Sequence, residues 1–145
     1  MTLLPPDFRE FLRLLNSHGV RYLLVGGYAV GYYGYPRATA DIDIWVETGA
    51  ENVAKLVSAL AGFGFAGVEP ELFAKDERVI RMGVPPLRIE LLTGVSGVKF
   101  DDCYPARTVA TLDEVEVSLI GLKDLKANKA ASGRYKDLND LEHLP

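Results

Sequence analysis

Two aspartates and a glycine pair are the residues of this chain best placed to do chemistry. Asp41 and Asp43 alternate with apolar residues in the segment 41–46, and Gly26-Gly27 ends the preceding apolar run. Side chains alternate faces along a strand and rise ~3.3 Å per residue, so the two carboxylates share one face, ~6.6 Å apart along the backbone. Two such carboxylates can bind one divalent cation, and the glycines leave room for a phosphate beside backbone amides. The pattern predicts a site for a metal-bound nucleotide.

Simpler interpretations exist for both features. Asp41 and Asp43 alone are also typical of a solvent-exposed strand face, and the glycine pair of a turn between a strand and a helix. An EF-hand is excluded because Trp45 and Val46 stand where further oxygen ligands and the loop glycine belong. Neither a Walker A loop nor the Gly-x-Gly-x-x-Gly of dinucleotide-binding folds is present.

A third acid, Glu90, lies in the apolar segment 87–92 and shares a strand face with Arg88. A carboxylate in an apolar strand is costly to bury unless it is paired or bound to a metal. Two interpretations stay open. Glu90 is either a metal ligand or an edge-strand glutamate paired with Arg88 or Arg81.

The segment 121–141 is rich in cations. They are Lys123, Lys126, Lys129, Arg134 and Lys136. These groups can reach phosphate oxygens or a polyanionic acceptor, or they form a solvated helix face with Lys/Asp pairs worth ~0.2–0.5 kcal/mol each. The spacing predicts that Leu138 and Leu141 face the core, with Asp137 and Asp140 on another side.

Arg37 and Thr39 lie between the glycines and the aspartates. A loop arginine there can contact a phosphate through two nitrogens, or it is a solvated charge. Tyr28, Tyr32 and Tyr35 follow helical spacing, which indicates core packing more often than a stacking site for a base.

The elements that must position these residues alternate between helix and strand without regular βαβ units. We expect helices near 5–19, 28–33, 51–60 and 122–144 with a break at Gly133, and strands near 22–25, 41–47, 77–83, 87–93, 109–110 and 115–120. The strands 77–83 and 87–93 are expected to be antiparallel neighbours, and an Asp-Glu turn joins the last two strands. This order predicts an α/β (α+β) fold, a mixed β-sheet flanked by helices with further helices at the C-terminus.

Length, charge and cysteine content limit the number of domains, the class of partner and the cellular compartment. A chain of 145 residues predicts a single domain over 1–145, and a net charge of −4 argues against a broadly basic nucleic-acid-binding face. One cysteine, Cys103, excludes an internal disulfide and favours a reducing compartment. The N-terminal residues lack the pattern of a signal peptide, and no apolar stretch approaches the ~20 residues of a membrane span. We therefore expect a cytoplasmic protein with no membrane partner.

Together, the glycine pair, the Asp-x-Asp and the later strand acid resemble the nucleotidyltransferase superfamily, whose palm is shared with DNA polymerase β. The longer string from Gly26 to Asp43 and the ending from Lys129 to Leu141 are similar to a bacterial branch related to abortive-infection toxins. The matched motifs extend from about residue 22 to residue 142, nearly the whole chain.

The resemblance implies a nucleotidyltransferase fold and assigns roles to the acids. It implies that Asp41 and Asp43 hold Mg²⁺, with Mn²⁺ as the alternative ion. Glu90 then is the third carboxylate, which ligates a second metal or helps to deprotonate the acceptor hydroxyl. Glu90 departs from the family's usual aspartate by one methylene, and Tyr28 replaces a serine that often follows the glycines.

The resemblance also assigns residues to the nucleotide. Gly26, Gly27, Arg37 and Thr39 would surround the triphosphate, as would Lys129 and Arg134 from the tail. Asp137 and Asp140 would orient those two cations.

The implied reaction is attack of an acceptor hydroxyl on the α-phosphorus of a nucleoside triphosphate such as ATP, with release of pyrophosphate. The branch implies an RNA, such as a tRNA, or a partner protein as acceptor. The alternative is a non-catalytic protein of the same fold that binds nucleotide or acts as the antitoxin of a toxin–antitoxin pair. The length of the chain favours this alternative, because it leaves little room for a separate acceptor-binding domain.

Overall fold

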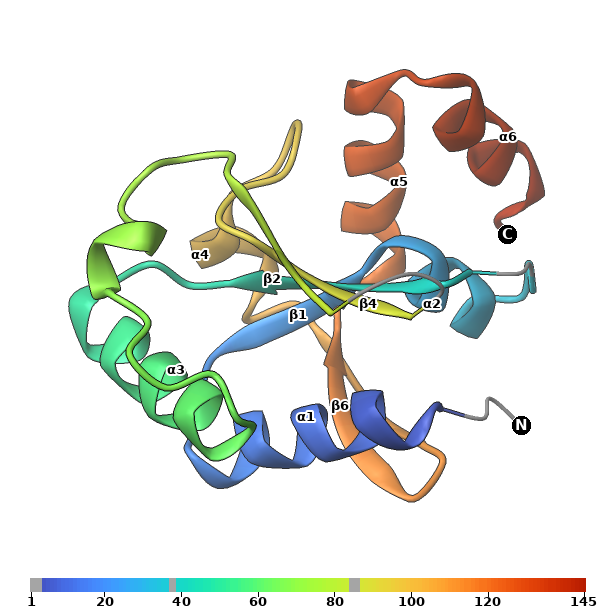
Figure 1. The fold of residues 1–145 in the computed structure, drawn as a ribbon. Helices are drawn as coiled ribbons and strands as arrows, with labels where there is room; N and C mark the ends of the chain where they lie inside the picture. Colours follow the sequence, from blue (N-terminus) through green and yellow to red (C-terminus); the bar gives the residue numbers. More distant parts are fainter. Residues whose placement is uncertain (1–3, 37–38, 84–86) are drawn as a thin grey trace.

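A mixed sheet carries the acids singled out in the sequence. The computed structural model describes residues 4–36, 39–83 and 87–145. Within them, six strands form one sheet in the order β3-β4-β2-β1-β6-β5 (Figure 1). β2 pairs with β1 antiparallel and with β4 parallel. The outer pairs β3/β4 and β5/β6 are antiparallel, and β1/β6 is parallel.

The strands are β1 Tyr22–Val25, β2 Asp41–Val46, β3 Val79–Met82, β4 Arg88–Leu92, β5 Thr108–Leu112 and β6 Val115–Leu119. The helices are α1 Pro6–Ser17, α2 Gly26–Tyr32, α3 Ala50–Gly62, α4 Phe100–Cys103, α5 Leu122–Ser132 and α6 Tyr135–His143, with a 3-10 turn η1 at Pro70–Phe73.

β2 has the alternation that its sequence predicts. Ile42 and Ile44 are fully buried, whereas Asp41 and Asp43 are half-buried on the other face. Trp45 on the acid face is also buried, because the ring of Phe100 packs edge-on against it. The strand therefore presents its two carboxylates together on one side of the sheet.

Helices cover both faces of the sheet. α1 and α3 lie along one face, and α5 and α6 rise from the other, which is the acid face (Figure 1). The apolar stripe Phe8, Phe11, Leu12 and Leu15 makes α1 part of the core. No helix in the described part of the chain is long and apolar enough to cross a membrane.

The predicted fold class, a mixed α/β sheet with flanking and C-terminal helices, is confirmed, with small differences in the elements. α2 begins at Gly26 rather than at residue 28, and η1 and α4 were not expected. The turn between β5 and β6 is formed by Asp113 and Glu114, both with positive φ (47° and 68°), as an Asp-Glu hairpin turn requires. The prolines expected between β3 and β4 fall in 84–86, outside the described residues.

One expectation about the C-terminal helix is wrong. On α6, Leu138 is 44% exposed, whereas Asp137 and Asp140 are 1% and 0% exposed. The acids face inward because the ammonium group of Lys129, from α5, lies between them. A buried ion pair therefore outweighs the apolar periodicity of this helix.

Candidate active site

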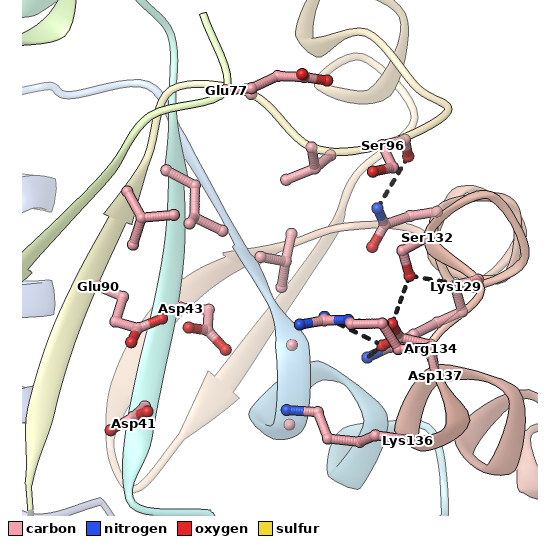
Figure 2. Close-up of a pocket in the computed structure, with 18 of the residues that line it drawn as sticks. Asp41, Asp43, Glu77, Glu90, Ser96, Lys129, Ser132, Arg134, Lys136 and Asp137 are labelled. Carbon is pink, nitrogen blue, oxygen red and sulfur yellow. Dashed lines mark hydrogen bonds and ion pairs between the residues drawn. The ribbon is translucent and has the colours of Figure 1, made fainter.

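The parallel pairing of β2 with β4 sets Asp43 directly beside Glu90. Their carboxyl groups face one another in Figure 2, close enough for one of them to donate a hydrogen bond to the other when it is protonated. Burial raises the pKa of Asp43 to about 7, helped by the hydrogen bond and the charge of Glu90, while Lys136 opposes the rise. Two carboxylates in contact repel each other when both are ionised, so this pair favours a shared proton or a bound cation.

Asp41 shares the face of Asp43, as the alternation predicts, but its carboxylate is held by a different partner. Arg88, its neighbour across the β2–β4 register, donates from Nε to Oδ1 at 3.2 Å and from Nη2 to Oδ2 at 3.3 Å. Glu90 accepts in turn from Nε of Arg81 on β3, at 3.1 Å. Of the two partners left open for Glu90, the structure therefore selects Arg81.

The glycine pair lies against the carboxylate of Asp43. Gly26 has φ +68°, and a Cβ at this position would collide with Oδ2 of Asp43. At Gly27 a Cβ would come within 3.0 Å of the side chain of Thr39, whose hydroxyl donates to the carbonyl of Asp41 at 3.0 Å. Gly26 thus needs glycine because strand β2 approaches the turn so closely, and a side chain at position 27 would require Thr39 to shift.

The opposite wall is built by α5 and α6. Lys129 is 4% exposed and donates to Asp137 at 3.0 Å and to Asp140 at 3.1 Å. An ammonium group has three N–H donors, so these two carboxylates leave it at most one for another ligand. Asp137 and Asp140 hold Lys129 in place, as the resemblance implied.

Asp137 also binds a second cation of this wall, Arg134. Arg134 donates from Nε to Asp137 at 2.7 Å, while its side chain stays 70% exposed. Burial alone would raise the pKa of Asp137, but hydrogen bonds from Arg134, Ser132 and Lys129 hold it well below its usual range. The carboxylate of Asp137 therefore stays charged and fixes both cations.

Lys136 is one of the five cations of the segment 121–141, but the resemblance did not assign it to the nucleotide. It lines the cavity, its charge acts on Asp43, and Figure 2 shows its side chain extending from α6 toward the acid wall. No ion pair of Lys136 is found within the described part of the chain. Its place in the first turn of α6, two residues after Arg134, is the signal that could have found it.

A cavity of about 470 Å³ lies between the two walls. The predicted residues that line it are Gly26, Gly27, Thr39, Asp41, Asp43, Glu90, Lys129 and Arg134. Arg37 lies outside the described residues. Further lining side chains that the sequence did not suggest are Glu77, Ser96, Asn128 and Ser132, whereas Arg81 and Lys136 were named in the sequence without a role at the nucleotide.

The donor set fits a divalent cation only in part. Mg²⁺ usually takes one or two carboxylates and completes its shell with water and substrate phosphates. Asp43 and Glu90 supply such a pair and lie close enough to repel each other. Asp41 is turned to Arg88, and in the described residues no group of three or more His, Cys, Asp or Glu side chains is arranged to hold a metal.

Solved structures of the same shape settle the fold. Protein TM1012 of Thermotoga maritima, assigned as a nucleotidyltransferase, superposes with a TM-score of 0.63 at 14% identity, covering 97% of this chain and 94% of its own. This chain has the nucleotidyltransferase fold. The lincosamide antibiotic adenylyltransferase LnuA, solved with lincomycin bound, gives a TM-score of 0.57 at 13% identity over 99% of this chain and 97% of its own.

A third neighbour, ANT(2″)-Ia in complex with adenylyl-2″-tobramycin, gives a TM-score of 0.53 at 10% identity and covers 93% of this chain and 83% of its own. No protein-family model matches the sequence, and no curated protein matches it. The nucleotidyltransferase fold is therefore shown by shape alone, since the sequences have diverged so far.

Proposed function

We propose that this protein is a nucleotidyltransferase that moves a nucleoside monophosphate from a nucleoside triphosphate, such as ATP, to a hydroxyl group of an acceptor. One observation carries the proposal. A single cavity has paired carboxylates on one wall, Asp43 and Glu90, and cations on the facing wall, Arg134 and Lys136. Carboxylates suit divalent cations and basic side chains suit phosphates, so the two walls together suit a metal–triphosphate complex.

The reaction forms one bond and breaks one. The acceptor oxygen bonds to the α-phosphorus, the bond from that phosphorus to the bridging oxygen of the β-phosphate breaks, and pyrophosphate leaves. In this proposal Glu90 takes the proton of the attacking hydroxyl, while Lys136 and Arg134 stabilise the charge on the leaving phosphates. Lys129 positions that wall through Asp137. Bound Mg²⁺ or Mn²⁺, held by Asp43 and Glu90 and joined by Asp41 once Asp41 leaves Arg88, would neutralise charge on the reacting phosphate.

A second cavity of about 770 Å³ adjoins the first and shares Glu77, Gly94 and Val95 with it. Its size lies in the range of pockets for small organic ligands, and we propose that the acceptor hydroxyl enters from this side. The sequence resemblance favours an RNA such as a tRNA, or a protein, as acceptor. The neighbours supply a third class, since LnuA has lincomycin bound and ANT(2″)-Ia holds an adenylylated tobramycin.

The test is transfer of label from α-³²P nucleoside triphosphates, with Mg²⁺ or Mn²⁺, to an acceptor panel of bulk tRNA, cell protein and small hydroxylated amines. We expect one acceptor class to be labelled, and Asp43→Asn and Glu90→Gln to lose the activity. Glu10→Gln is the matched control, because Glu10 is exposed on α1, which covers the opposite face of the sheet. Labelling that survives Asp43→Asn would overturn the proposal.

The non-catalytic alternative rests on one observation, the capture of Asp41 by Arg88. A protein of this fold that only binds nucleotide, or that acts as an antitoxin, has no need for a free metal-binding aspartate. It would bind a labelled triphosphate or a toxin partner without releasing pyrophosphate. Measuring pyrophosphate release alongside nucleotide binding separates the two functions.

A further inference from the structure

Arg88 donates hydrogen bonds to the carboxylate of Asp41, which the proposed metal would need as a ligand. It reaches Asp41 from the neighbouring strand and grips both oxygens, with donor distances of 3.2 and 3.3 Å. Unlike Asp41, Arg88 is not among the residues that line the cavity. The pair therefore ties the Asp41 carboxylate to the neighbouring strand β4.

The grip of Arg88 and the coordination of a metal exclude each other. A guanidinium held by two parallel N–H bonds uses lone pairs on both carboxylate oxygens, and a hard cation needs the same lone pairs. The side chains of Arg88 and Asp41 are 34% and 27% exposed, so water can reach the pair and the contact can be exchanged.

The neighbouring acid has a weaker version of the same contact. Arg81 donates one N–H to Glu90 at 3.1 Å, and its side chain is 57% exposed. Asp43, between the two, has no arginine partner among the described residues and lies in contact with Glu90. Among the described residues, arginines therefore pair with Asp41 and Glu90, whereas Asp43 has only the more distant charge of Lys136.

We propose that Arg88 is an exchangeable counter-ion of this site, which holds Asp41 in the metal-free protein and releases it when a divalent cation binds. The inference rests on the proposed function for the identity of the cation site. In the free protein a metal must compete with the guanidinium, so metal alone binds weakly. A metal that arrives with a triphosphate meets less competition, because the released guanidinium gains phosphate oxygens as new acceptors. Metal binding then depends on nucleotide.

The test is Mn²⁺ binding to the purified protein without nucleotide, followed by the electron paramagnetic resonance signal of free Mn²⁺. We expect Arg88→Gln to bind Mn²⁺ about 5- to 10-fold more tightly than the wild type, the range expected when a partly exposed ion pair no longer competes. Arg13→Gln removes the same charge from an exposed position on α1 and is the matched control, with no expected gain.

A second substitution separates contact from a general change of charge. In an Asp41→Asn background, replacing Arg88 by Gln should give no gain, because the carboxylate that Arg88 releases is gone. Arg88→Lys, which keeps the charge but loses the two-pronged grip, should give a smaller gain than Arg88→Gln and serves if the glutamine variant folds poorly.

Two results would overturn the inference. One is an unchanged Mn²⁺ affinity in both Arg88 variants, and the other is a gain that persists without the Asp41 carboxylate. Neither result depends on transfer activity. An enzyme that labels its acceptor but shows no Arg88 effect would refute this inference alone, whereas a gain through Asp41 in a protein that labels nothing would refute only the proposed reaction.

Discussion

Replacing Asp43 by asparagine should make the metal-free protein more stable at alkaline pH. Asp43 is buried against Gly26 and in contact with Glu90, and its pKa is raised from 3.8 to about 7. The folded protein therefore keeps a proton on Asp43 that the unfolded chain loses near pH 4. The folded state loses stability as pH rises from about 4 to about 7, and the full penalty is present above about pH 7.

The size of the effect follows from the shift. At ~1.36 kcal/mol per pKa unit, a rise of roughly three units corresponds to an upper bound of ~4 kcal/mol. Rearrangement of the side chains around Asp43 reduces this figure, and we expect a gain of about 1–3 kcal/mol for Asp43→Asn at about pH 8. Asparagine keeps the shape of the side chain and can donate an N–H to Glu90.

The assay is urea unfolding of both proteins in EDTA across a pH series. The difference between Asp43→Asn and wild type should be near zero at about pH 4, grow through about pH 7 and then level off. Added Mg²⁺ should raise the midpoint of the wild type more than that of the variant, because ligand that binds only the folded state stabilises it. If the variant is no more stable than the wild type at alkaline pH, the inference that ionised Asp43 and Glu90 destabilise the folded protein is refuted.

Three further substitutions test the residues that hold the walls of the cavity in place. Lys129→Met should cost ~3–5 kcal/mol in urea unfolding, because it strands two buried carboxylates, while Lys123→Met, at an exposed position of α5, should change little. Gly26→Ala should cost ~1–3 kcal/mol through its positive φ and its collision with Asp43, and should weaken nucleotide binding in a filter assay. Asp137→Asn should destabilise strongly at neutral pH but less as pH falls below 3.8, since the lowered pKa of Asp137 contributes its full stability above the pKa of the unfolded chain and loses it as pH falls toward the lower pKa of the folded protein. A constant cost of Asp137→Asn down to acid pH would contradict that assignment.

The acid wall could be predicted because it follows from local periodicity. Alternating Asp and Ile residues fix the faces of β2 whatever its neighbours are. The meeting of Glu90 with Asp43 was implied only by the family resemblance, and it arises because β2 and β4 are adjacent and parallel, which puts the two residues at the same level. The partners of the arginines could not be predicted, since a shift of register by two residues would exchange Arg88 for another side chain beside Asp41.

Which face of α6 is buried could not be predicted, for a different reason. Apolar periodicity on α6 favours burial of Leu138, and the helix instead buries Asp137. The deciding partner, Lys129, lies on another helix, and the energy of such a buried pair depends on geometry that no local pattern contains.

The two lysines of this wall have different physical roles. Lys129 is enclosed by carboxylates at 3.0 and 3.1 Å, and removing it would strand their charge in the core. Lys136, one residue before Asp137, is exposed and acts on Asp43 across the cavity. The buried cluster of Lys129, Asp137 and Asp140 therefore fixes the start of α6, and that placement aims Lys136 at the acids. On α6, Asp137 thus contributes to stability, while its neighbour Lys136 directs a positive charge toward the acids. Changes to Lys129 should lower stability first, whereas changes to Lys136 should lower triphosphate affinity with the fold intact.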